Sequence, residues 1–332
     1  MSVTAKDIAK ALNISAAAVS MALNNKPGVS DELRAKIFST ANEMGFKYSK
    51  KMLRKNHKMI AVMFMHKNFI FDSAFFSEVG NSIEYRLKEH GYRLNAYHIH
   101  EHSDIQKEIE KVINDDPDGI ILFGTLMMSS DIHYFNHLSI PVLLLDAYFS
   151  SFDGDSVVIN NMEGARSATE YLIDHCNCCP GYIRSSNAFP NTLERADGFF
   201  KAIRNAGYHS NQVIMHEVIA SSENSYADMI EIIDSKEPLA NAYFCDNDEI
   251  AIGAIRAFKD RGYRIPEDIS IIGFDNMNYS AYVTPPLTSI NVPKVYMGKI
   301  AADRLMETIQ SEVHYPIKIA INTNLVIRKS VK

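Results

Sequence analysis

Several features that would point to other classes of protein are missing or scarce in this chain. It has no tryptophan, and three of its four cysteines fall within the segment from His175 to Cys179. Adjacent cysteines do not form a framework of spaced disulfides, and their spacing differs from the paired C-x₂-C of structural zinc. We expect an ordinary loop with free thiols, with metal binding or redox sensing as the alternative. His98, His100 and His102 alternate along a strand end, which indicates a solvated edge rather than a metal site.

Catalytic and membrane signals are also absent. The chain contains no G-x-S-x-G, G-x-G-x-x-G, P-loop or H-E-x-x-H motif. No run approaches the roughly 18 apolar residues of a membrane helix, and the N-terminus lacks the apolar core of a signal peptide. We therefore expect a cytoplasmic protein with no catalytic residues, no cofactor, no metal and no membrane association.

Charge is distributed unevenly along the 332 residues. The net charge is −6, yet residues 1–58 carry 11 Lys and Arg against 4 Asp and Glu, so this end is +7 and the remainder −13. The length predicts two or three folded units. A basic head on an acidic body indicates binding to a polyanion such as DNA, although a merely solvated basic end has the same composition.

The head carries the start and stop signals of three short helices. Thr4, Ser15 and Ser30 are N-cap residues, and the expected ends lie near Asn13, Leu23 and Gly45. Two short helices that cross steeply need a small residue, a left-handed turn residue four positions later and an apolar anchor six beyond that. Ala9, Asn13 and Val19 have this spacing.

This spacing predicts a helix-turn-helix whose second helix enters the DNA major groove, led by Ser15, Ala16 and Ala17. A three-helix bundle without a DNA-binding role is the alternative.

From Met59 onward, apolar runs alternate with helical segments in two series, which predicts two doubly wound parallel lobes. The expected strands are 59–65, 93–99, 119–124 and 141–146, then 156–160, 181–186, 242–246 and 269–275.

Ligands of such sheets bind beyond the carboxyl ends of the strands. Asp146 and Asp275 each close an apolar run, so they are candidate hydrogen-bond acceptors for a ligand, or else simple caps of the following turn.

Longer motifs make the chain recognisable. The segments that carry the likeness are residues 4–15, Val19-Ser20, Leu23-Asn24, Lys26-Pro-Gly-Val-Ser30, Ala41-Asn-Glu-Met-Gly-Phe46, Asp248-Glu-Ile-Ala-Ile-Gly253, residues 261–276, Thr284-Pro-Pro-Leu-Thr-Ser-Ile290 and Leu325-Val-Ile-Arg328. They resemble the LacI/GalR family of bacterial transcription repressors. The resemblance implies a small all-α helix-turn-helix head and an α/β two-lobed body of the periplasmic-binding-protein-like type I fold, with crossovers near residues 158, 290 and 320. The implied units are the head (1–46), a hinge (47–58), a first lobe (59–158 with 291–319) and a second lobe (159–290 with 320–332).

The resemblance also implies which residues contact DNA. They are Thr4, Ser15, Ala16, Ala17, Ser20, Met21 and Asn24 in the head, with Lys50, Lys51 and Arg54 on phosphates and Leu53 as a minor-groove wedge. Two departures stand out. The alanines offer no hydrogen bond to a base edge, so readout should depend on thymine methyls and on polar neighbours. The hinge lacks the family's usual Pro-Asn, so a basic flexible linker is the alternative there.

For the effector, the resemblance implies Phe75 and Asp146 from the first lobe and Asn191, Arg195, Phe244, Asn247 and Asp275 from the second. An aromatic face with charged neighbours suits a sugar or sugar phosphate, with a purine or nucleoside as the alternative. We predict a homodimeric, ligand-responsive repressor on double-stranded operator DNA, in which ligand binding and operator binding are linked. A periplasmic-type sugar-binding protein would share the body but would need a signal peptide and no basic head.

Overall fold

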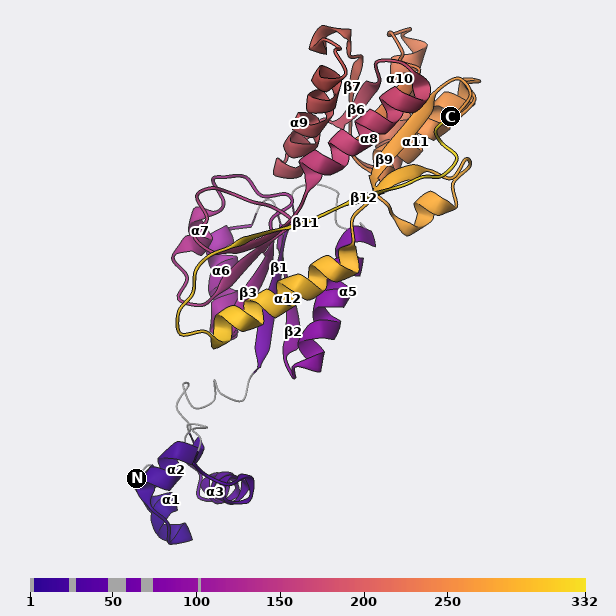
Figure 1. Cartoon of the computed structure of the whole chain (residues 1–332). Coiled ribbons are helices and arrows are strands. Elements are labelled where there is room, and N and C mark those ends of the chain that lie inside the picture. Colours follow the sequence, from indigo (N-terminus) through magenta and orange to yellow (C-terminus); the bar gives the residue numbers. More distant parts are fainter. Residues whose placement is uncertain (1–2, 24–27, 47–57, 67–73, 101–102) are drawn as a thin grey trace.

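The computed structural model describes residues 3–23, 28–46, 58–66, 74–100 and 103–332. Figure 1 shows three units: a small helical head and two α/β lobes. None of the described helices has the length and apolar character needed to span a membrane.

The head consists of α1 (Ala5–Leu12), α2 (Ala16–Leu23) and α3 (Asp31–Glu43). Asn13 ends α1 in the left-handed conformation (φ 53°), which asparagine tolerates better than most residues, so the chain can turn sharply into α2. Apolar side chains from all three helices meet in a core that contains Ile8, Ala9, Val19, Ala22, Leu23, Ile37 and Ala41. This small core determines how α2 is presented.

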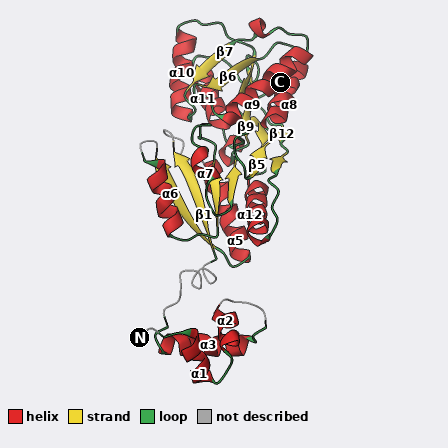
Figure 2. Ribbon diagram, turned by 90° about the vertical axis from the view of Figure 1, so that its left-hand side faces the viewer, coloured by secondary structure: helices red, strands yellow, loops and turns green. Residues whose placement is uncertain are grey.

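The first lobe is built on a six-stranded, wholly parallel sheet in the order β11-β5-β4-β3-β1-β2. Its strands are β1 (Met59–His66), β2 (Arg93–His100), β3 (Gly119–Phe123), β4 (Val142–Leu145), β5 (Asp155–Ile159) and β11 (Lys318–Ile321). Its helices are α5 (Ala74–Glu89), α6 (Ile105–Asn114), α7 (His133–Asn136) and α12 (Lys294–Gln310). Helices α5 and α12 lie side by side on one face and α6 covers the other, so the central strands are buried on both sides (Figure 2).

The second lobe has a sheet in the order β12-β10-β9-β8-β6-β7, in which only β12 is antiparallel. The strands are β6 (Gly181–Ser185), β7 (Met215–Val218), β8 (Ala242–Cys245), β9 (Ser270–Asp275), β10 (Thr288–Asn291) and β12 (Asn324–Val326). The helices are α8 (Asn161–Cys176), α9 (Pro190–Asn205), α10 (Ser222–Asp234) and α11 (Asp248–Asp260), with short 3₁₀ turns η2 (Ser210–Gln212) and η3 (Asn278–Ala281).

The chain passes between the lobes three times, from β5 to α8, from β10 to α12 and from β11 to β12. Asparagine side chains connect these passages. The Asn160 amide donates to Asn322 Oδ1 at 3.1 Å, and the Asn291 amide donates to Asn324 Oδ1 at 3.0 Å. The crossings therefore form a hydrogen-bonded hinge. The predicted fold class is confirmed, although the sequence patterns did not predict β7, β10, β11 and β12, which are only three or four residues long.

Candidate functional site

Helix α2 presents a face of small side chains to solvent. Ser15, Ala16, Ala17 and Ser20 are exposed and Met21 is half-buried, while the opposite face of the helix is buried in the head. The Ser15 hydroxyl oxygen accepts a hydrogen bond from the Ala18 backbone N–H at 3.1 Å, so Ser15 caps the helix as its position predicts. The remaining predicted DNA contacts, Asn24, Lys50, Lys51, Leu53 and Arg54, lie outside the described residues.

Thr4 has a structural role at the start of α1. Its backbone N–H and its hydroxyl both donate to the Asp7 carboxylate, at 2.8 and 2.6 Å. These bonds lower the pKa of Asp7 and place a negative charge at the positive end of the helix dipole. Thr4 remains exposed, so capping leaves its surface open to DNA.

A cleft lies between the lobes, where the carboxyl ends of both sheets meet. Its enclosed volume is about 100 Å³, and about 620 Å³ when the open space at its mouth is included. Six of the seven predicted effector residues line it, together with seven others. The predicted ones are Phe75, Asp146, Asn191, Arg195, Asn247 and Asp275, and the others are Phe76, Thr125, Leu126, Ser185, Phe189, Thr192 and Ala220.

Asp146 is a hydrogen-bond acceptor on the first-lobe side of the cleft. It follows β4, it is almost fully buried, and its φ of 62° turns the chain sharply out of the sheet. Its carboxylate accepts hydrogen bonds from the Thr125 hydroxyl at 2.5 Å and from the Asn191 amide at 3.1 Å. Burial raises the pKa of Asp146 to about 7, although the Thr125 bond and the nearby Arg195 both oppose this. Asn191 comes from α9 of the second lobe, so this bond connects the lobes.

Arg195 is held on every side within the second lobe. Its guanidinium donates to Asn161 Oδ1 at 3.0 Å, to the Asp246 backbone carbonyl, and to Asp275 Oδ1 at 3.2 Å. It also stacks over the Phe274 ring at 3.8 Å. Because Arg195 is only 6 % exposed, these contacts fix its direction before any ligand enters.

Two further aspartates lie behind the cleft wall. Asp246 accepts from the Tyr182 hydroxyl and from the Ser185 N–H, and burial raises its pKa to about 6. Asp248 accepts from the Ser280 and Ser289 hydroxyls at 2.6 Å each, and burial raises its pKa to about 7. Both position the loops around Asn247, whose side-chain Oδ1 accepts a hydrogen bond from the Ile250 N–H and caps α11.

Comparison with known proteins identifies the chain. Residues 4–49 match the model for bacterial regulatory proteins of the lacI family, and residues 170–331 match a periplasmic binding protein-like domain. The HTH-type transcriptional repressor PurR of Pasteurella multocida (strain Pm70) is 30 % identical over 99 % of this chain and 98 % of its own length. The chain belongs to the lacI family. The predictions of a DNA-binding, ligand-responsive transcription regulator and of a protein without catalytic activity are confirmed.

Solved structures of lacI-family regulators share the fold over much or nearly all of the chain. A regulator from Enterococcus faecium with bound ribose is 25 % identical, with a TM-score of 0.71 over 82 % of this chain and 98 % of that one. A lac repressor dimer bound to operator and the anti-inducer ONPF is 20 % identical and covers 99 % of both chains, with a TM-score of 0.74, so it shows the fold alone.

One predicted effector residue of this lacI-family chain is placed elsewhere. Phe244 is fully buried, and its ring packs against Tyr182 at 5.4 Å and Phe199 at 6.1 Å in the core. Successive side chains of a strand point to opposite faces, and Phe244 precedes the last residue of β8, so it faces the layer of α8 and α9 rather than the cleft. The prediction for Phe244 is wrong, and Asn247, three positions later, reaches the cleft instead.

Several cleft residues were not predicted from the sequence. Thr125 follows β3 by two positions, so the strand-end rule that found Asp146 and Asp275 would also have found it. Phe76 adjoins Phe75 and their rings meet edge to face at 5.7 Å. Phe189 stands at the start of α9, and no local pattern marks it as a cleft residue.

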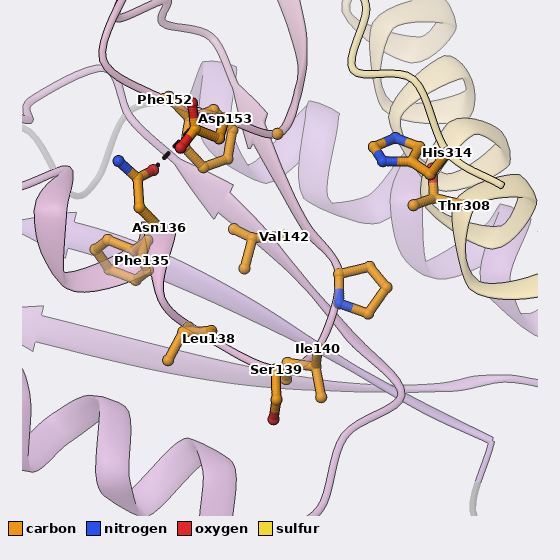
Figure 3. Close-up of a pocket in the computed structure, with 12 residues that line it drawn as sticks. Phe135, Asn136, Leu138, Ser139, Ile140, Val142, Phe152, Asp153, Thr308 and His314 are labelled. Carbon is orange, nitrogen blue, oxygen red and sulfur yellow. Dashed lines mark hydrogen bonds between the residues drawn. The ribbon is translucent and has the colours of Figure 1, made fainter. Parts of the chain in front are cut away.

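A second pocket lies away from the cleft, at the amino ends of β4 and β5 (Figure 3). Phe135, Leu138, Ile140 and Val142 form much of its wall, and Thr308 and His314 face it from the far side. Three of its polar side chains are already paired with protein atoms. Asn136 Oδ1 accepts from the Asp153 N–H at 3.4 Å, and both Thr308 and His314 bond to Asp155. None of the predicted effector residues lines this pocket, whereas six line the interlobe cleft, so the cleft is the candidate effector site.

The cysteine cluster and His98 show ordinary packing, whereas His102 lies outside the described residues. Cys176, Cys178 and Cys179, at and just after the end of α8, are half-buried free thiols that pack against the core. His98, on the edge strand β2, stacks on Phe64 at 5.3 Å. Within the described part of the chain, no three His, Cys, Asp or Glu side chains are grouped closely enough to hold a metal ion.

Proposed function

We propose that this protein is a homodimeric transcription repressor that binds operator DNA through α2 and responds to a sugar or sugar phosphate in the interlobe cleft. Two heads are needed because one short helix contacts too few bases for tight specific binding. The operator-bound dimer of the lac repressor, which shares this fold over its full length, supports the dimeric part of the proposal.

The exposed face of α2 supports major-groove binding of an unusual kind. Its alanine methyls suit thymine methyl groups, while Ser15 and Ser20 supply the few hydroxyls that can hydrogen-bond to bases or phosphates. In the proposal, Lys50, Lys51 and Arg54 add phosphate contacts and Leu53 opens a base step in the minor groove. We expect the protein to act in the cytoplasm, where operator DNA lies.

The described lining of the cleft favours a neutral sugar. It contains two carboxylates, Asp146 and Asp275, and one guanidinium, Arg195, whose bonds to protein groups already satisfy much of its donor capacity. Paired carboxylates accept hydrogen bonds from adjacent hydroxyls, and the rings of Phe75 and Phe189 can cover the apolar face of a pyranose or furanose. The ribose-bound regulator of Enterococcus faecium is consistent with this class of ligand.

The observation that carries the mechanism is the hydrogen bond from Asn191 to Asp146 across the cleft. A ligand hydroxyl that binds Asp146 competes with Asn191, so occupancy changes the contact between the lobes. The three hydrogen-bonded crossings then convert that change into a different angle between the lobes, which alters the spacing of the two heads in the dimer. By linkage, operator binding changes ligand affinity by the same factor.

Operator binding measured with and without candidate ligands tests the proposal. Duplexes selected from a random library serve as operators, and affinity is measured from 50 to 200 mM salt with neutral sugars, sugar phosphates and purine nucleosides. We expect log affinity to fall linearly with log salt, by about 0.9 per phosphate contacted, and one neutral sugar to shift the curve. A shift caused only by a nucleoside would replace the sugar with a purine effector. Unchanged DNA retention after deletion of residues 1–58 would overturn the role of the head.

A further inference from the structure

Lys294 is a buried lysine directly beside the effector cleft. It is the first residue of α12, immediately after the second crossing between the lobes, and it is only 4 % exposed. An ammonium group is rarely buried unless it is paired or hydrogen-bonded, because leaving water costs it a large solvation free energy. The partners of Lys294 therefore indicate what this group is for.

Three backbone carbonyl oxygens accept hydrogen bonds from the Lys294 ammonium group. Nζ donates to the carbonyl oxygens of Asp275 at 2.8 Å, Asn276 at 3.2 Å and Val292 at 3.4 Å. The carboxylate of Glu78, on α5 of the first lobe, lies 3.9 Å away. Lys294 thus belongs to a helix that packs on the first lobe, while its charge binds a turn of the second lobe.

That turn has an unfavourable backbone. Asp275 and Asn276 both have left-handed φ angles, 95° and 49°, which non-glycine residues adopt only when their surroundings hold them there. Asn276 is also fixed through its N–H to Ser289 at 3.0 Å and through its side-chain oxygen to Arg328 at 2.7 Å. The carboxylate of Asp275 points in the other direction, to Arg195 in the cleft.

We propose that Lys294 is a positioning residue for the effector site. Its ammonium holds the left-handed Asp275–Asn276 turn through the two carbonyls, and this fixes the Asp275 carboxylate opposite Asp146 in the cleft. The proposal rests on the function proposed above, in which Asp275 binds the effector. Removing the charge should loosen the turn and weaken ligand binding while leaving the head and its DNA contacts unchanged.

Hydrogen exchange of the full-length protein tests the first step without a ligand. The backbone N–H groups of Asn276 and Met277 bond to Ser289 and Asp248 and should exchange slowly in the wild type. In Lys294→Met we expect at least tenfold faster exchange at these two sites and unchanged exchange in α11. Lys299→Met removes an exposed lysine from the same helix, and Glu78→Gln removes the carboxylate 3.9 Å from Nζ but none of its three hydrogen bonds to carbonyls, so both should match the wild type. If Asn276 and Met277 exchange in Lys294→Met as slowly as in the wild type, the proposal is overturned. Lys294→Gln is used instead if Lys294→Met does not fold.

Ribose serves as the probe for the second step. In a wild type that binds ribose, Lys294→Met should bind it at least tenfold more weakly, while its operator affinity without ribose stays within twofold of wild type. If the substitution only reduced the fraction of folded protein, the apparent affinities for ribose and for the operator would fall by the same factor. Equal ribose affinity alongside faster exchange would refute the link to the effector site. A wild type that ignores ribose would count against the sugar effector, and the exchange comparison would then decide on Lys294 alone.

Discussion

Gly198 of α9 lies against the backbone of Met162 in α8. A Cβ at position 198 would come within 2.1 Å of the Met162 carbonyl oxygen, closer than any real contact. This close approach brings α9 onto α8, and the same helix α9 carries Asn191 and Arg195 into the cleft. The packing of two helices therefore sets the position of two candidate effector residues.

Gly198→Ala should destabilise the body by about 1–3 kcal/mol, because the added methyl has no room and the helices must separate. Gly80→Ala, in α5, is the matched control, since the nearest atom to its Cβ would be 4.0 Å away. That change should stabilise the protein by about 0.5–1 kcal/mol, as expected for alanine in place of glycine within a helix. Urea unfolding followed by circular dichroism measures both, and equal effects of the two substitutions would contradict the packing argument.

Asn191→Ala should lower the free energy of unfolding by about 1–3 kcal/mol, because it leaves the buried Asp146 carboxylate without its partner from the second lobe. Asn205→Ala, at the exposed end of the same helix, should change it by less than about 0.5 kcal/mol. The same urea titrations compare the two variants. If Asn205→Ala lowers the free energy of unfolding as much as Asn191→Ala does, the hydrogen bond between the lobes does not contribute specifically to stability.

The pKa of Asp146 predicts a pH dependence of stability. Burial raises this pKa from 3.8 to about 7, so the folded state binds the proton more tightly than the unfolded chain. The resulting stabilisation is fully present below about pH 4 and is lost as the pH rises through about 7, by about 1.4 kcal/mol per pH unit between those limits. Asp146→Asn cannot titrate, so the difference in unfolding free energy between wild type and variant should change with pH from 5 to 7 and level off above.

Asp153→Asn removes an exposed aspartate from the same lobe and serves as the control for that experiment. Its difference from the wild type should stay constant over the same pH range. If the Asp146→Asn difference is also constant from pH 5 to 8, the carboxyl group is ionised throughout and the predicted shift is wrong.

Ala17→Glu should reduce operator affinity by at least tenfold without unfolding the head, because it places a carboxylate on the exposed face of α2 against DNA phosphates. Ala35→Glu adds the same charge to an exposed position of α3 and should have a much smaller effect. Fluorescence anisotropy with selected operator duplexes measures both affinities. Equal losses would indicate a general charge effect rather than a contact made by α2.

The local sequence was sufficient for the head and for the strand ends. Caps at Thr4, Ser15 and Ser30 and the left-handed Asn13 act within a few residues of themselves, so their roles follow from neighbouring positions along the chain. Asp146 and Asp275 were predictable because a parallel sheet brings all its carboxyl ends to one edge. Family resemblance added Asn191, Arg195 and Asn247, which no local pattern marks.

Other features depend on contacts between distant segments. The direction of Phe244 follows from which face of β8 the helices α8 and α9 cover, and alternation along a strand does not say which face that is. Lys294 meets Asp275 only because the chain returns to the first lobe immediately after β10, and its burial becomes favourable only when three carbonyls converge on it. Hydrogen bonds between groups far apart in the sequence exist only after the lobes have packed, so they are properties of the tertiary structure.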